Sequence, residues 1–199
     1  MITVAILGKK SDRRMTDYLI RSFDGVCPCL FLTPFGTIRT MQNPSQTDPF
    51  QPLILFWDSE NTDIHCIPDI ILLKDSCESI TPLVKENTIV IFHSSNPIHL
   101  ETVRGMSIHA IACGSSKRDT ITFSSALAER PVLCVQRMIH TLDGEETEPF
   151  ELPIEADPGW ARYPLQGVFA LLVLLGISEQ VHSIFEKNIL HDRQNQEKI

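Results

Sequence analysis

Five residues between Gly8 and Arg13 are of the types that bind phosphate. Gly8 ends an apolar run, and Lys9, Lys10, Ser11 and Arg13 follow it. Backbone N–H groups at the start of a helix attract anions, and neighbouring cations add to that attraction. We therefore predict a degenerate phosphate loop with these five residues as its cofactor-binding side chains. The alternative is a solvated charged loop, which the ordinary surface exposure of lysine and arginine favours.

The stretch lacks the residues that a working phosphate loop requires. Such a loop has a second glycine, then lysine and serine or threonine, after the first glycine. Counted from Gly8, the standard register offers residues 13–15 and a shorter register offers residues 11–13. Asp12 would stand in the place of the lysine and would repel phosphate. The sequence thus predicts the frame of a nucleotide site and no catalytic residue.

Three polar residues follow buried apolar runs further along the chain, namely Asp58, Asp75 and Asn96. In open α/β sheets the ligand site lies at the carboxyl ends of the parallel strands. We therefore expect these three residues to surround a cleft together with the loop at residues 8–13. In an ATP-dependent reaction, Lys9 or Lys10 would supply the phosphate cation, and Asp58 or Asp75 would hold Mg²⁺.

Other clusters fall short of the spacing that a metal or redox site needs. His93, His99 and His109 lack the further converging ligands of a zinc site. Cys27 and Cys29 have one residue between their thiols, where metal and redox motifs have two. We therefore predict no metal site and no resident cofactor, and interpret the cysteines as buried, reduced thiols.

Continuous apolar runs predict a parallel sheet that is covered on both faces. The predicted strands are residues 2–7, 26–33, 53–57, 68–73, 88–92 and 108–113. Helical spacing of apolar residues predicts a helix from Met15 to Phe23, with Ser11 or Asp12 as its cap. A short helix follows Pro97 and ends near Gly105.

The pattern then changes to strands without intervening helices. Residues 120–125 and 132–138 read as strands, Asp143-Gly144 is a turn signal, and residues 150–155 alternate apolar with polar. This predicts a small antiparallel element. An apolar helix at residues 165–177 and a second helix from residue 178 to residue 189 follow.

We expect one domain over residues 1–199, since domains commonly have about 100–200 residues. Within it, the proline- and glycine-rich residues 34–52 predict a mobile surface loop, and residues 191–199 predict a frayed polar tail.

The order of these elements resembles the central, ATP-binding domain of the Mur ligases, the ATP-dependent amide-bond-forming enzymes of cell-wall synthesis. Residues 6–13 stand where that family has its strand and Gly-Thr-Asn-Gly-Lys-Thr loop, with Gly8 retained. Phe56 stands at the metal-binding glutamate of the family. Residues 91–97 resemble its Asn-x-Asp-Asp-Pro motif, with Pro97 retained.

The resemblance implies an α/β fold, a mostly parallel sheet with helices on both faces plus a small antiparallel element. It also implies a degenerate single-domain relative, because this length cannot hold the two flanking domains of the ligases. We accordingly predict a non-catalytic domain that binds a protein or a small ligand, with a link to cell-wall metabolism by analogy. The alternative is an ATP-dependent ligase or transferase with an altered phosphate loop.

Composition narrows the partners further. The net charge of −8 argues against nucleic acid and anionic membranes, which need a basic face. The apolar run at residues 165–177 is shorter than the roughly 20 residues that span a bilayer. The N-terminus enters a strand without a cleavage pattern, which predicts a cytoplasmic protein. A homodimer would be the simplest cover for faces that neighbouring domains would otherwise bury.

Overall fold

The computed structural model describes residues 1–40, 53–60, 67–78, 84–104, 106–125, 131–154 and 161–177. The predicted helix at residues 178–189, the tail at residues 191–199 and residues 41–52 of the predicted loop lie outside these ranges. The described residues divide into two compact units, the first over Met1–Ile111 and the second from Ala112 onward. The prediction of a single domain stays a prediction.

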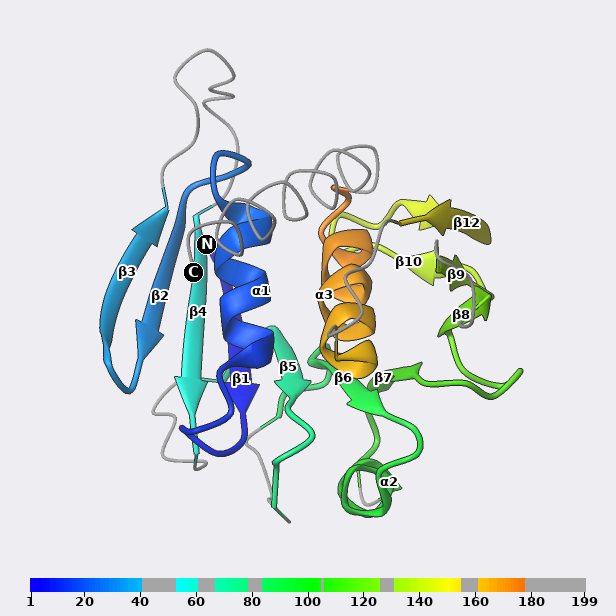
Figure 1. Cartoon of the computed structure of the whole chain (residues 1–199), viewed down its shortest axis with the longest axis horizontal. Coiled ribbons are helices and arrows are strands. Elements are labelled where there is room, and N and C mark those ends of the chain that lie inside the picture. Colours follow the sequence, from blue (N-terminus) through cyan, green and yellow to red (C-terminus); the bar gives the residue numbers. More distant parts are fainter. Residues whose placement is uncertain are drawn as a thin grey trace, which may run out of the picture. The chain divides into compact units, whose positions relative to one another are not determined.

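Ten strands form one sheet in the order β12-β9-β8-β7-β6-β5-β1-β4-β2-β3 (Figure 1). The strands of the first unit are β1 (Ile2–Leu7), β2 (Cys29–Thr33), β3 (Gly36–Thr40), β4 (Ile54–Ser59), β5 (Ile70–Leu73), β6 (Ile89–His93) and the start of β7 (His109–Cys113). All of their pairings that the structure describes are parallel except that of β2 with β3. The predicted α/β fold with a mostly parallel sheet is confirmed.

The core of the first unit lies where α1 (Arg14–Phe23) packs against the sheet. Met15, Leu19 and Phe23 recur at helical spacing and are buried, as predicted. The ring of Phe23 meets that of Phe56 edge-on at 5.1 Å, and Phe56 stacks on Phe31 at 4.4 Å. Aromatic burial on this scale dominates core energetics, so these rings fix α1 on β4 and β2.

The prediction for the start of α1 is wrong in its cap. Arg13 occupies the N-cap position without a side-chain hydrogen bond to the helix. Asp12 turns away from the helix N–H groups because both of its carboxylate oxygens accept from the guanidinium of Arg14, at 2.9 and 3.0 Å. The carboxylate of Asp12 is therefore engaged by an arginine side chain and not by the helix N–H groups.

The predicted mobile loop at residues 34–52 is wrong for residues 36–40, which form β3. Proline and glycine here make only a tight turn, in which Thr33 Oγ1 donates to the carbonyl of Gly36 at 2.8 Å. The chain then reverses and pairs with β2 over five residues, from Thr33 opposite Gly36 to Cys29 opposite Thr40. Pro34 and Phe35 therefore form only the turn, and the residues from Gly36 to Thr40 return to an extended conformation.

The second unit contains the antiparallel element that the sequence predicts. β8 (Ile121–Ser125), β9 (Val132–Val135) and β12 (Phe150–Pro153) pair antiparallel, while β10 (Ile139–His140) and β11 (Glu146–Thr147) form a separate hairpin around the predicted turn. The predicted strand 132–138 ends at Val135, so Arg137 is exposed in the connection and needs no partner inside the sheet.

Helix α3 (Arg162–Leu174) is buried on all sides, as predicted for the most apolar run of the chain. Its one amide side chain, Gln166, donates from Nε2 to the carbonyl of Gly114 at 2.8 Å. That bond satisfies a polar group that burial would otherwise penalise. None of the helices that the structure describes has the length and apolar character needed to cross a membrane.

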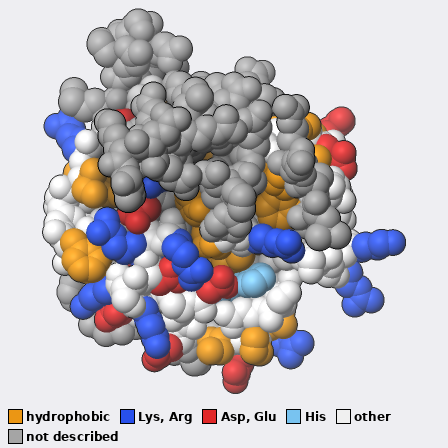
Figure 2. Space-filling view, viewed as in Figure 1, with side chains coloured by type: hydrophobic (Ala, Val, Ile, Leu, Met, Phe, Trp, Pro, Cys, Tyr) orange, Lys and Arg blue, Asp and Glu red, His pale blue; other side chains and the backbone are white. Residues whose placement is uncertain are grey.

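The remaining described helix is α2 (Pro97–Arg104), which follows β6 in the first unit. Figure 2 shows positively and negatively charged side chains interspersed over the coloured part of one face. The positive charges near the predicted loop thus lie beside negative ones, and the next subsection describes how they are paired.

Candidate phosphate-loop site

The predicted loop lies between β1 and α1, and several of its backbone N–H groups donate to acceptors of the chain itself. Four of them at residues 8–12 donate to acceptors of the chain itself: Gly8 to the carbonyl of Ser59 at 3.0 Å, Lys9 to Ser76 Oγ at 3.2 Å, Lys10 to Glu60 Oε1 at 2.7 Å and Asp12 to the carbonyl of Lys9 at 3.0 Å. A phosphate-binding loop keeps such groups for its ligand. Here the first three hold the loop against the end of β4 and the segment after β5, and the fourth closes a turn within the loop.

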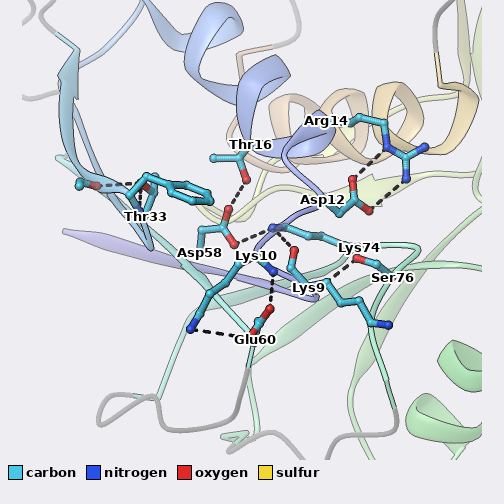
Figure 3. Close-up of polar contacts among 12 residues, drawn as sticks. Lys9, Lys10, Asp12, Arg14, Thr16, Thr33, Asp58, Glu60, Lys74 and Ser76 are labelled. Carbon is cyan, nitrogen blue, oxygen red and sulfur yellow. Dashed lines mark hydrogen bonds and ion pairs between the residues drawn. The ribbon is translucent and has the colours of Figure 1, made fainter.

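A buried ion pair lies beneath the loop (Figure 3). Lys74 Nζ contacts Asp58 Oδ1 at 2.6 Å, and the two side chains are 1% and 4% exposed. Thr16 Oγ1 of α1 donates to Asp58 Oδ2 at 2.6 Å, and Lys74 Nζ also reaches the carbonyl of Lys9 at 3.4 Å. Both oxygens of the carboxylate are therefore occupied, which is what a charged pair at this depth requires.

The side chain of Lys74 packs against Gly8, where there is no room for a Cβ atom. Gly8 has φ of +152°, and a Cβ placed on it would come within 2.6 Å of Lys74 Cβ. Real Cβ atoms do not approach side-chain carbons so closely, so only glycine lets the lysine stem pass. The retained glycine of this loop thus makes room for a side chain of the chain itself.

Every cation of the loop faces a carboxylate. The exposed pairs are Lys9 with Glu78 at 3.2 Å, Lys10 with Glu60 at 3.6 Å, Arg13 with Asp17 at 3.1 Å and Arg14 with Asp12 at 2.9 Å. Exposed pairs contribute about 0–1 kcal/mol each, so a competing anion displaces them readily. The buried pair of Lys74 with Asp58 and the occupied N–H groups are the stronger obstacles to a phosphate.

Two carboxylates of the loop region are stabilised as anions. The Lys10 N–H lowers the pKa of Glu60 below its ordinary value, and the Lys10 ammonium adds to this. Burial raises the pKa of Asp12, but hydrogen bonds from Arg14 and Ser76 outweigh it and hold the pKa below normal. The loop therefore carries fixed negative charge of its own at neutral pH.

Asp75 and Asn96 lie together just after β5 and β6. Asn96 Nδ2 donates to the carbonyl of Asp75 at 3.1 Å, and Asn96 Oδ1 accepts from the Ile98 N–H at 3.0 Å. Asp75 Oδ1 lies 2.7 Å from His93 Nδ1. Asn96 therefore holds the start of α2 in place.

Asp58 does not join Asp75 and Asn96. It lies under the loop with its oxygens occupied by Lys74 and Thr16. Of the other predicted site residues, Ser11 is exposed, and Lys9, Lys10 and Arg13 are held in the surface pairs described above. Among the described residues, no group of three or more metal-ligating side chains converges.

His99 is a site residue that the sequence reasoning assigned no role. Its Nδ1 accepts from the backbone N–H of His93 at 3.0 Å, and its Nε2 lies 2.9 Å from the carbonyl of Lys74. The ring is therefore neutral with its proton on Nε2, and burial lowers its pKa. The position of His99 in the sequence did not predict its contacts with Lys74 and His93, because the ends of β5 and β6 meet only in the folded sheet.

Lys74 and Glu60 were also missed. Lys74 carried one usable signal, since it directly extends the fully buried run of β5 and a lysine there needs an acidic partner. Phe56, at the position of the family's glutamate, is fully buried between Phe23 and Phe31. An acidic side chain there would now lie in the aromatic core.

No protein-family model matches the sequence, and no curated protein matches it. Among solved structures, the chain is similar to UDP-N-acetylmuramoylalanyl-D-glutamyl-2,6-diaminopimelate–D-alanyl-D-alanyl ligase from Acinetobacter baumannii. The TM-score is 0.56 at 10% identity, covering 94% of this chain and 46% of that one.

Two further structures are similar to the same degree. UDP-N-acetylmuramate:L-alanyl-γ-D-glutamyl-meso-diaminopimelate ligase from Neisseria meningitides gives a TM-score of 0.57 at 13% identity, covering 94% of this chain and 64% of that one. A murein peptide ligase from Psychrobacter arcticus gives 0.56 at 9% identity, covering 93% and 46%. At these identities the likeness shows a Mur-ligase-like fold, and the chain spans less than two thirds of each ligase.

Proposed function

We propose that this chain is a non-catalytic domain of Mur-ligase-like fold that acts by binding a small ligand or a protein, without a nucleotide. The observation that supports this most is the Lys74–Asp58 pair beneath the loop. It fills the space under Gly8 with a charge pair that is already balanced.

Phosphoryl transfer makes demands that this loop does not meet. Lysine and Mg²⁺ must neutralise the charge that develops on the γ-phosphate. Asp58 cannot ligate Mg²⁺ while Lys74 and Thr16 hold its two oxygens. An entering phosphate would also have to displace Glu60 from the Lys10 N–H. Each of these contacts would have to break before a nucleotide and Mg²⁺ could bind, which lowers the affinity for both. Together they favour a protein that has no nucleotide-dependent reaction.

The proposed link to cell-wall metabolism is supported only by the fold. The structural neighbours described above are ligases whose names contain muramoyl or murein compounds. Fold alone does not carry a reaction from one protein to another.

A second candidate is an ATP-dependent ligase or transferase with altered loop chemistry. The observation that favours it is the weakness of the four exposed ion pairs, since a nucleotide at millimolar concentration would compete with them. Lys9 and Lys10 would then be free to contact phosphate, and Asp75 would be the carboxylate left for Mg²⁺.

Calorimetric titration with ATP and Mg²⁺ at millimolar nucleotide separates the two candidates. The proposal predicts no saturable heat. One-to-one binding that Lys10→Ala abolishes, and that the exposed control Lys117→Ala leaves unchanged, would contradict it and establish the second candidate. A parallel thermal-shift measurement with the same nucleotide checks that weak heats are not overlooked.

A further inference from the structure

A row of apolar side chains crosses the sheet from β5 to β3, the strand at the end of the sheet. The register sets Ile70 beside Val4, Val4 beside Phe56, Phe56 beside Phe31, and Phe31 beside Ile38. The first four are 0–1% exposed, whereas Ile38 is 37% exposed. The row is thus buried as far as Phe31 and ends at Ile38, an exposed side chain that one more strand would cover.

The edge itself is open. Gly36, Thr37, Ile38 and Arg39 are all exposed, and no described strand pairs with the outer side of β3. Every second residue of such a strand directs its N–H and C=O away from the sheet. Edge strands are normally protected by proline, by several charges or by bulges. β3 has one charge and no proline, whereas β12, at the other end of the strand order, carries Glu151 and Pro153.

We propose that β3 pairs antiparallel with β3 of a second copy of this chain, about a two-fold axis at Ile38. That axis sets Ile38 opposite the partner's Ile38 and continues the apolar row into the second sheet. It sets Arg39 opposite the partner's Thr37, so no like charges face each other directly. A two-fold interface must be self-complementary, and this register meets that condition with a single strand.

The alternative occupant is an extended segment of another protein, which would add to the same edge by main-chain hydrogen bonds. The self-complementary register favours the second copy, because the only apolar residue of β3 lies at its centre. The proposal goes beyond the binding function above and does not depend on it, since the edge lies on β3 and the phosphate-loop site lies between β1 and α1.

Sedimentation equilibrium of the full chain tests the pairing over about 10 µM to 1 mM, since a five-residue edge gives a weak dimer. The proposal predicts a monomer–dimer equilibrium. Ile38→Lys should weaken it at least about ten-fold, because two ammonium groups would then face each other at the axis. Ile98→Lys is the matched control, since Ile98 is also 37% exposed but lies on α2. Circular dichroism confirms that both variants fold.

A second variant tests the register. Ile38→Cys should form a disulfide-linked dimer under mild oxidation with diamide, with mass spectrometry placing the bond between the two residues 38. Arg39→Cys should not link to itself, because its counterpart lies across and two residues along. A monomer at every concentration, equal dimerisation of the Ile38→Lys and wild-type proteins, or a bond that joins other cysteines would each overturn the proposal.

Discussion

At the scale of single residues, Lys74 determines what the loop is able to do. It is a fully buried lysine whose ammonium lies 2.6 Å from Asp58 and 3.4 Å from the carbonyl of Lys9. A buried pair of charges is balanced only while both partners are present. Removal of one leaves an uncompensated charge, at a cost of about 3–5 kcal/mol. The pair therefore contributes to the stability of the fold. It also fills the space beneath Gly8, where a phosphate and its metal ion would have to bind.

Replacement of Lys74 should be far more costly than replacement of an exposed lysine. Lys74→Met should lower the free energy of unfolding by about 3–5 kcal/mol, measured by urea denaturation. The matched control is Lys85→Met, which breaks a pair of the same 2.6 Å length with Asp69 but is 44% exposed, and it should cost about 0–1 kcal/mol. Lys74→Met/Asp58→Leu should recover much of the loss. Equal costs for the two single variants would show that the buried pair is not balanced as described.

Residue types alone predicted part of this site. Gly8 follows from the break after an apolar run, and the loss of the phosphate-binding lysine follows from Asp12. The pairing of Lys74 with Asp58 could not be predicted, because it depends on β4 and β5 flanking β1 from opposite sides. Phe56 was recognised as a strand residue, but its place between two other rings depends on the register of β2.

At the scale of elements, His99 fastens α2 to the ends of two strands. It joins the carbonyl of Lys74 after β5 to the N–H of His93 in β6. Both contacts require the neutral ring, since a proton on Nδ1 would face the donating N–H of His93. Burial lowers the pKa of His99 in the folded protein, whereas the unfolded chain titrates near the ordinary value of about 6.5.

Stability should therefore fall as the pH is lowered through that range. Above about pH 6.5 the ring is neutral in both states; below it the unfolded chain takes up a proton that the folded protein does not. Uptake of this one proton lowers the free energy of unfolding by at most about 1.4 kcal/mol per pH unit. Urea denaturation between about pH 7.5 and 5.5 should show a shallower loss for His99→Gln than for wild type. The exposed control His109→Gln should follow wild type, and equal slopes for all three proteins would contradict this role of His99.

The elements themselves were largely readable from the sequence. Continuous apolar runs identified the parallel strands and the buried helix α3, because burial on both faces removes the alternation of polar residues. The strand β3 was missed, because Pro34 and Gly36 suggested a long loop and the strand after them is exposed. The start of α1 was misjudged because Arg14 competes with the helix for Asp12.

At the scale of the whole molecule, the chain has a Mur-ligase-like fold, and the N–H groups of its loop are bound by acceptors of the chain itself. The strand order of the sheet and the similarity to solved ligase structures define this fold. The internal acceptors Ser59, Ser76 and Glu60 take the N–H groups that a nucleotide would use. The proposed binding role requires a stable fold, and the buried ion pair and the aromatic core stabilise this one.

The most direct test of this account is a ¹⁵N–¹H NMR titration of the labelled protein with ATP and Mg²⁺. The account predicts that the amide signals of Gly8, Lys9, Lys10 and Asp12 do not move at millimolar nucleotide, because internal acceptors already hold those N–H groups. Saturable shifts concentrated on these amides would show that the loop releases its own acceptors and binds phosphate. That result would contradict the account and support the alternative of an ATP-dependent ligase or transferase.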